Sequence, residues 1–214
     1  MNTTKNEKMM QRVMMMAVLA IGLFFTGLVQ AQTNKLITQN SVGPINIEMT
    51  VAEARKAVAP MTLSRRSDGE GIALIAVKDG ENEVLTLYAK ETDAAAPIDE
   101  NALIEQIYVW DETYKTEAGV HPKMMLSNVE THYGKVMEIT LSEIESREYA
   151  TFENQLRGMS FRVEGSPKAG NYAENERTTT RYSNGAIVLA IEVIRPHYPN
   201  ENPDETKVRE ETPF

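Results

Sequence analysis

Two short stretches of the sequence begin a helix in nearly the same way. In "MTVAEARKAV", Thr50 can cap the first backbone N–H groups of a helix, and Glu53 can reach back to the Thr50 N–H. This reciprocal pattern is a capping box. In "LSNVETHYGK", Ser127 and Glu130 repeat the spacing, and Gly134 stands where a glycine commonly ends a helix. We therefore expect the chain to contain two short capped helices.

Runs of β-forming residues follow each of these helix starts. They span residues 72–77, 84–89 and 103–110 after the first start, and 135–141, 148–152, 158–163 and 185–194 after the second. The Asp79-Gly80 pair between the first two runs is a hairpin signal. The pattern predicts an α+β protein of two similar halves, about 36–117 and 118–195. Each half would be a short capped helix followed by three to four antiparallel strands.

The N-terminus has the three parts of an export signal. Three basic side chains precede the uncharged apolar run Val13–Val29, and small residues then lead to Ala31. This order is typical of a signal peptide, residues 1–31, cleaved between Ala31 and Gln32. The alternative is an uncleaved anchor, because such a run reaches the lower length limit for crossing a bilayer. We expect export to the periplasm or the exterior, with no membrane insertion after cleavage.

Composition limits how the mature chain is stabilised and what it binds. The chain has no cysteine, which excludes an acylated lipoprotein, disulfides and thiolate metal sites. A single α+β domain, residues 32–195, would depend on an ordinary hydrophobic core, and 196–214 is expected to be a disordered acidic tail. The net charge of −9 becomes −11 without residues 1–31, which carry three basic and one acidic side chain. Such acidity argues against nucleic acid as a partner.

Carboxylates are the only candidates for catalytic chemistry. The stretch "LSEIESREY" gathers Glu143, Glu145 and Glu148 around Arg147. Paired carboxylates can hydrolyse glycosidic bonds when they flank the bond at a set separation. The sequence contains no nucleophile-elbow or nucleotide-binding motif, and its three histidines lack metal-ligand spacing. We therefore expect no cofactor, no metal and no catalytic site, with a carboxylate-dependent hydrolase of glycan or peptide as the alternative.

An aromatic stretch is the best candidate for recognition. On an alternating strand, Tyr108 and Trp110 point to one face together with Ile104, and Ile107 and Val109 point to the other. Aromatic side chains with a polar group serve interfaces well. The alternative, which we favour for Trp110, is that the only tryptophan packs as core beneath the second helix. Tyr114 lies outside the regular run and is then expected to be the exposed group.

The middle of the chain resembles a class of uncharacterised exported bacterial proteins. The stretch 104–135, "IEQIYVWDETYKTEAGVHPKMMLSNVETHYGK", follows their order of a strand, a Gly-Val turn and a capped helix ending in Tyr-Gly. The upstream "VGPINIEMTVAEA" is similar to the start of the same proteins. The envelope-stress-regulated (RpoE-regulated) lipoprotein family shares this layout more distantly, although the present chain lacks the acylated cysteine. The resemblance implies export and supplies no catalytic residues.

The layout of two helix-plus-sheet units also resembles the fold of periplasmic beta-lactamase-inhibitor-like modules and of small outer-membrane assembly modules. The leading interpretation is an exported, soluble, non-catalytic protein that binds another protein or an envelope component. Its candidate binding residues come from the aromatic stretch and the acidic turn: Tyr108, Trp110, Tyr114, Glu143, Arg147 and Glu148.

Overall fold

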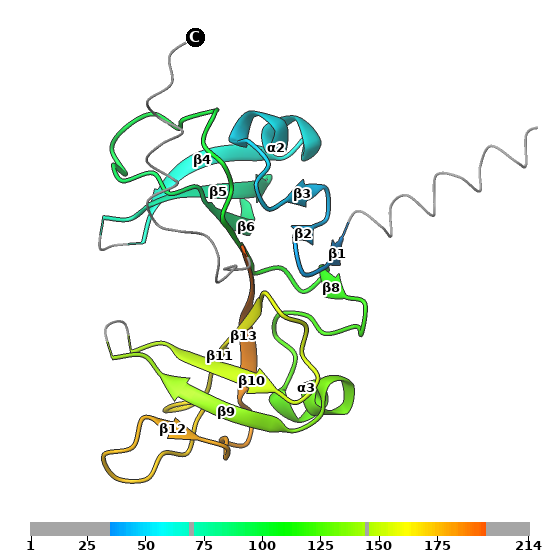
Figure 1. Cartoon of the computed structure of the whole chain (residues 1–214), viewed down its shortest axis with the longest axis vertical. Helices are drawn as coiled ribbons and strands as arrows, with labels where there is room; N and C mark the ends of the chain where they lie inside the picture. The colour runs from blue at the N-terminus through cyan, green and yellow to red at the C-terminus, as the bar shows by residue number, and fades with distance from the viewer. Residues whose placement is uncertain (1–34, 69–70, 144–145, 196–214) are drawn as a thin grey trace, which may run out of the picture.

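The computed structural model describes residues 35–68, 71–143 and 146–195 (Figure 1). Within these ranges the chain forms two helices and thirteen strands. The helices are α2 (Val51–Ala57) and α3 (Leu126–Tyr133). The strands are β1 (Leu36–Ile37), β2 (Ser41–Val42), β3 (Ile45–Asn46), β4 (Thr62–Ser67), β5 (Ala73–Asp79), β6 (Asn82–Tyr88), β7 (Gln106–Val109), β8 (Lys115–Thr116), β9 (Val136–Leu141), β10 (Glu148–Phe152), β11 (Met159–Glu164), β12 (Thr178–Thr179) and β13 (Ile187–Ile194).

Nine of these strands form one antiparallel sheet in the order β12-β9-β10-β11-β13-β7-β6-β5-β4. A small second sheet has the order β3-β2-β1-β8, with β1 and β8 parallel. The α+β class predicted from the sequence is therefore confirmed. The Asp79-Gly80 hairpin is confirmed as well, because Asp79 pairs with Asn82 across the β5–β6 turn.

Helix α2 is followed by four neighbouring strands of the large sheet, and α3 is followed by four others together with the two-residue edge strand β12. We call α2 with β4–β7 the first unit, and α3 with β9, β10, β11 and β13 the second unit. The fourth strands of the two units, β7 and β13, pair with each other antiparallel, Tyr108 opposite Glu192. This pair is the seam between the units, and the two helices lie at opposite ends of the same side of the molecule (Figure 1).

The hydrophobic core fills the space between one face of the large sheet and the helices. Val51 and Ala54 of α2 and Leu126 and Val129 of α3 are fully buried in it. Phe161 of β11 packs against the ring of Tyr133 at a centroid separation of 5.8 Å. Because side chains alternate along a strand, the neighbours of these core residues point to the opposite face of the sheet.

The first predicted helix start is confirmed. Thr50 is the N-cap of α2, its Oγ1 accepts from the Glu53 N–H, and the Glu53 carboxylate accepts from the Thr50 N–H at 3.0 Å. The second is wrong in its cap. Helix α3 begins at Leu126 with Met125 as N-cap, and no side chain caps it. The Glu130 carboxylate instead accepts from the Val136 N–H at 3.0 Å and from the Tyr182 hydroxyl at 2.8 Å.

The start of each helix makes similar backbone contacts with the residues at or just before the last strand of its unit. Thr50 forms an isolated bridge with Leu103, and Met125 forms one with Ile187. The first N–H of each helix donates to a carbonyl next to this bridge. Val51 donates to the carbonyl of residue 102, and Leu126 donates to the carbonyl of residue 186.

Two backbone conformations extend the correspondence. Glu48 and Lys123, each three residues before the first helical residue, have φ angles of +68° and +67°. Seventy-five positions separate Val51 from Leu126, whereas 77 separate Thr50 from Ser127. The backbone contacts of the two helix starts therefore match at an offset that is two residues shorter than the offset of the capping pattern.

Several strands were not expected from the sequence, namely β4, which is the edge of the large sheet, and the short strands β1, β2, β3, β8 and β12. The signal peptide with its Ala31–Gln32 cleavage point and the tail 196–214 lie outside the described residues, so both stay predictions. Among the residues that the structure describes, no helix is long and apolar enough to cross a membrane.

Candidate functional site

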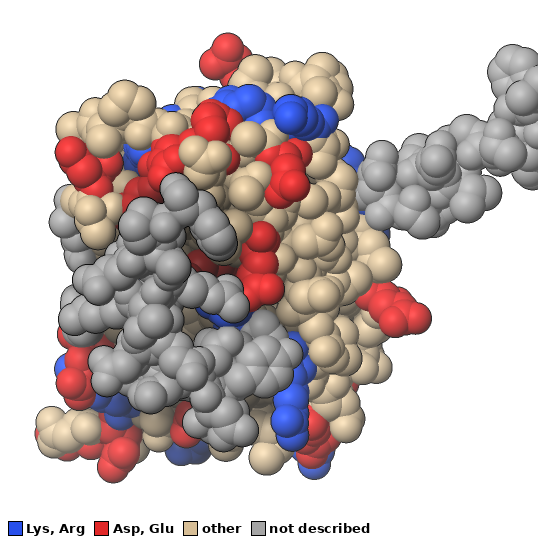
Figure 2. Space-filling view, turned by 45° about the horizontal axis from the view of Figure 1, so that its top comes forward, with Lys and Arg blue, Asp and Glu red and all other residues tan. Residues whose placement is uncertain are grey.

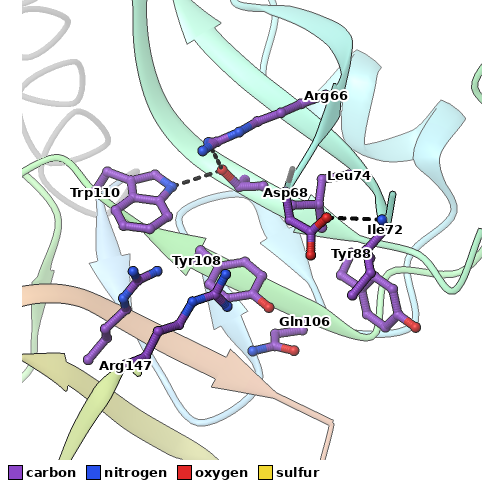
Figure 3. Close-up of a pocket in the computed structure, with 11 residues that line it drawn as sticks. Arg66, Asp68, Ile72, Leu74, Tyr88, Gln106, Tyr108, Trp110 and Arg147 are labelled. Carbon is purple, nitrogen blue, oxygen red and sulfur yellow. Dashed lines mark hydrogen bonds between the residues drawn. The ribbon is translucent and has the colours of Figure 1, made fainter. Parts of the chain in front are cut away.

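A pocket of about 380 Å³ opens on the face of the large sheet that points away from the helices (Figure 3). Strands β4, β5, β6, β7 and β11 and the turn before β10 contribute to its wall. It is lined by three arginines, three aromatic residues and five others: Arg66, Arg147, Arg162, Tyr88, Tyr108, Trp110, Asp68, Ile72, Leu74, Thr86 and Gln106.

Strand register brings these residues together. Thr86 of β6 is the cross-strand partner of Tyr108 on β7, and Tyr108 is in turn opposite Glu192 on β13. Paired residues on adjacent strands project to the same face of a sheet. The prediction that Ile107 and Val109 point away from Tyr108 is confirmed, because both are fully buried in the core. The placement of Ile104 on the face of Tyr108 is wrong, because Ile104 precedes β7 and is buried in the core.

Trp110 is held in place by two contacts. Its indole Nε1–H donates to the Thr86 hydroxyl at 2.8 Å, and the Arg162 guanidinium lies 5.9 Å from the ring centroid. The Tyr108 and Trp110 rings are nearly parallel, at 8° and with centroids 6.2 Å apart. Thr86 is itself buried, with 1 % of its surface exposed. The two rings therefore form an ordered aromatic platform in the pocket wall.

The other two arginines of the pocket, Arg66 and Arg147, have different surroundings from Arg162. The Arg66 guanidinium contacts the Glu83 carboxylate and lies 3.2 Å from the Thr86 hydroxyl, so its charge is partly compensated. Arg147 hydrogen-bonds the Tyr149 phenol. Burial raises the pKa of Tyr149, and the nearby Glu192 carboxylate adds to this rise while Arg147 opposes it.

Two carboxylates lie in or near the pocket, those of Asp68 and Glu192. Asp68 accepts from the backbone N–H of Ile72 at 3.0 Å, and in Figure 3 it lies on the opposite side of Tyr108 from Arg147. Glu192, which is 3 % exposed, accepts from the Gln106 side-chain amide at 3.0 Å. The pocket thus has a basic, aromatic end and a more apolar end that carries Asp68.

The structure brings together three of the predicted binding residues, Tyr108, Trp110 and Arg147. The favoured interpretation of Trp110 as core beneath the second helix is wrong, because it lines the pocket on the other face of the sheet. The prediction that Tyr114 is exposed is also wrong. Tyr114 is 1 % exposed, packs in the core and has the Lys35 ammonium 5.3 Å from its ring centroid. Burial raises its pKa to about 12.

The acidic turn does not contribute a carboxylate pair to the pocket. The Glu143 side chain is 79 % exposed and pairs with Arg177 at 3.5 Å. Glu148 points into the core side, where it accepts from the N–H groups of Ala169 and Gly170 at 2.7 and 2.8 Å and from the Tyr172 hydroxyl at 2.8 Å. Glu145 lies outside the described residues.

Glu148 is therefore an acceptor that fastens the connection between β11 and β13. The hydrolase alternative needs two carboxylates that meet in one pocket, and Glu143 and Glu148 do not line this one. Among the described residues, no group of three or more His, Cys, Asp or Glu side chains has an arrangement suited to a metal ion.

Sequence reasoning did not identify Arg66, Thr86 and Arg162 as site residues. Arg66 belongs to an edge strand with a largely polar sequence, and Arg162 alternates with core residues of β11. In β11, Ser160, Arg162 and Glu164 alternate with three buried apolar residues, so the sequence alone places Arg162 on the face away from the core. The association of Arg162 with Trp110 nevertheless depends on the order of strands in the sheet.

The comparisons with known proteins identify a fold. The crystal structure of the uncharacterized protein YfeY from Escherichia coli is similar to this chain with a TM-score of 0.51 and 15 % sequence identity, covering 74 % of this chain and 99 % of YfeY. At this identity the likeness concerns the fold alone. No protein-family model matches the chain, and no curated protein sequence matches it. The chain therefore shares a distant architectural similarity with a bacterial protein that is itself uncharacterized.

Proposed function

We propose that this chain is an exported, non-catalytic binding protein and that the pocket on the open face of the sheet is its binding site. The observation that carries the proposal is the fixed position of Trp110 between the Thr86 hydroxyl and the Arg162 guanidinium. A binding site benefits from side chains that are ordered before the ligand arrives, because less conformational entropy is then lost on binding.

The size of the pocket favours a small ligand. Its volume of about 380 Å³ falls at the lower end of the range for small-molecule sites. A protein–protein interface instead buries about 800 Å² on each partner, usually over a broader surface. Of the two partner classes that the sequence suggests, we therefore favour a small envelope component over another protein.

Export is part of the proposal and is supported by the signal-like N-terminus. If cleavage follows Ala31, the first residue of the mature protein is Gln32. The described surface carries interspersed acidic and basic side chains, with acidic ones gathered towards the end that bears α2 (Figure 2). This mixture is typical of a water-exposed protein surface.

We also infer that 36–117 and 118–195 are related halves. Support comes from the matching bridges at Thr50 and Met125 and the matching positive φ angles at Glu48 and Lys123. The order of one helix and four strands is also the same, apart from the two-residue edge strand β12 in the second half. In each helix, the buried positions recur at the same 75-residue separation, since Val51 and Ala54 correspond to Leu126 and Val129.

Site-directed photo-crosslinking in intact cells tests the binding proposal. Benzoylphenylalanine replaces either Ile72, which is 43 % exposed at the rim of the pocket, or Met137, which is 55 % exposed on β9 and serves as the matched control. We expect a discrete adduct of small mass at position 72 and none at position 137. A protein adduct at position 72 would show that the partner is a protein and not a small molecule. The absence of any adduct would overturn the proposal.

A further inference from the structure

The arrangement of charges in the pocket restricts the chemistry of its ligand. The protein as a whole is acidic, with 31 Asp and Glu against 22 Lys and Arg. The lining of the pocket reverses this balance, since it includes three arginines and a single carboxylate, that of Asp68. A guanidinium is the side chain best suited to hold a carboxylate or phosphate through two parallel hydrogen bonds.

Arg162 is the arginine best placed for this role. Within the described part of the chain, no carboxylate lies within ion-pair distance of Arg162, and its guanidinium faces the Trp110 ring at 5.9 Å from the centroid. Arg66, by contrast, contacts Glu83. The Arg162 guanidinium lies at cation–π distance from Trp110, and its N–H groups form a planar fork that can donate to an anion.

The aromatic platform defines the other part of the ligand. Tyr108 and Trp110 are parallel to within 8°, and the Thr86 hydroxyl fixes the rotation of the indole. Flat rings of this kind favour a planar or apolar group that stacks on them. Leu74 and Ile72 add apolar surface on the far wall.

We propose that the pocket binds a small planar anion, a carboxylate or phosphate ester carried on an aromatic or otherwise flat group, with Arg162 holding the anion and the Tyr108–Trp110 platform holding the flat part. Arg147, which lines the same end of the pocket, adds a second positive charge beside the anion. This inference rests on the proposed function and names the ligand class for the same site.

Trp110 is the only tryptophan of the chain, so its fluorescence reports on this pocket alone. The full chain is titrated with benzoate and phenyl phosphate, with neutral benzamide and with inorganic phosphate, at constant ionic strength. We expect saturable quenching by the two aromatic anions and binding that is at least about tenfold weaker for benzamide, because a charge-assisted bidentate contact is worth about 1.5–3 kcal/mol. Inorganic phosphate should be weak as well, since it lacks the flat group.

The variant Arg162→Gln isolates the predicted contact, and Arg157→Gln, which changes an exposed arginine outside the pocket, is the matched control. Arg162→Gln should weaken benzoate binding about tenfold and leave benzamide binding unchanged, while Arg157→Gln should change neither. Thermal unfolding of both variants checks that the fold is retained. Vesicles of phosphatidylglycerol distinguish a lipid head group from a free ligand, because only a lipid source gives co-sedimentation of the protein.

Equal binding of benzamide and benzoate, or an Arg162→Gln variant that binds benzoate as the unmodified protein does, would overturn the planar-anion proposal. The crosslinking at Ile72 separates the two levels of inference. A small adduct there together with failed anion titrations means that the pocket binds a ligand of another class. No adduct and no titration response means that the proposed function itself is wrong.

Discussion

The two units of the large sheet fasten their longest connection by different chemistry. In the first unit, the β6–β7 connection is held by an ion pair, in which Arg65 of β4 donates to Glu91 at 2.7 Å and also to the carbonyls of Ala96 and Pro97. In the second unit, the β11–β13 connection is held by the lone carboxylate of Glu148, which accepts from two backbone N–H groups and one phenol.

The difference shows that a long connection before the last strand of a unit can be held either by an ion pair or by a single buried carboxylate. An ion pair brings its own counter-charge, so either partner compensates the other as both are taken from water. A lone buried carboxylate depends entirely on neutral donors, each of which must be directed at it. Both solutions hold the backbone of the connection. Arg65 donates to two carbonyls and Glu91 accepts from the Asp99 N–H in the first unit, whereas Glu148 accepts from two peptide N–H groups in the second.

Removal of Glu148 or Arg65 should lower the free energy of unfolding more than the other substitutions proposed below. The sizes of the two losses should show which connection is held more strongly. Glu148→Ala leaves two buried N–H groups and the Tyr172 hydroxyl without their acceptor, and we expect the free energy of unfolding to fall by about 3–5 kcal/mol. Arg65→Ala should cost less, about 2 kcal/mol, because Glu91 keeps the Asp99 N–H as a donor. Urea unfolding followed by circular dichroism measures both.

Glu143→Ala is the control for the loss of a carboxylate, because that side chain is exposed, and its unfolding midpoint should be unchanged. Equal losses for Glu148→Ala and Arg65→Ala would show that the two connections are fastened equally strongly, and a larger loss for Arg65→Ala would reverse the comparison.

Acid should weaken the Arg65–Glu91 ion pair of the first unit. The hydrogen bond from Arg65 holds the pKa of Glu91 below its ordinary value of 4.5 in the folded protein. A carboxyl whose pKa is lowered by folding contributes stability above its unfolded pKa and loses that contribution as the pH falls through the folded pKa. The free energy of unfolding should therefore decline as the pH drops below 4.5.

Arg65→Met separates this effect from the other carboxylates. Without the guanidinium, the pKa of Glu91 is no longer lowered, so the variant starts from a lower stability and should lose less of it between about pH 6 and pH 3 than the unmodified protein does. Chemical unfolding at a series of pH values provides the measurement. Parallel curves for the two proteins would exclude Glu91 as a source of acid sensitivity.

The smallest predicted effect distinguishes the two helix starts. Thr50→Ala removes the side-chain cap of α2 and should lower the free energy of unfolding by about 1 kcal/mol. Ser127→Ala should change it by less than about 0.5 kcal/mol, because Ser127 lies inside α3 and makes no cap hydrogen bond. Thermal unfolding measured for both variants in one buffer resolves the difference. A comparable loss at Ser127 would mean that Ser127 is the N-cap and that α3 begins two residues later, at Asn128.

The failed cap at Ser127 shows what local sequence omits. The spacing of Ser127 and Glu130 equals that of Thr50 and Glu53, yet Glu130 accepts from Tyr182 and the Val136 N–H instead. These partners lie in other elements, so a pattern of four residues contains no information about them. The helix itself was predictable, because Val129 and Tyr133 lie one turn apart and are both buried.

The strands were predictable wherever a core-facing pattern was strong, as in β5, β6, β11 and β13. The edge strand β4 was missed because "TLSRRS" has one buried residue, Leu63, and otherwise polar side chains. Edge strands commonly carry charge on both faces, which removes the alternation that identifies a strand.

The pocket was predictable only in part, for a similar reason. Alternation along one strand places Tyr108 and Trp110 on the same face, and this was read from the sequence. The contacts with Thr86 and Arg162 require the order of the strands in the sheet, which depends on all the pairings together. Tyr114 follows a turn in which its N–H donates to the Asp111 carbonyl, and that turn directs its ring into the core.

The pocket forms only when β7 and β13 are paired, because its lining comes from both sides of this seam. Trp110 and Thr86 come from the first unit and Arg147 and Arg162 from the second, so neither unit alone contains the basic end and the aromatic wall together. A molecule that occupies the pocket contacts both units and binds only when the seam is closed. By mass action, such a ligand raises the free energy needed to separate the units. Occupancy of the pocket would then act as a clamp across the middle of the chain.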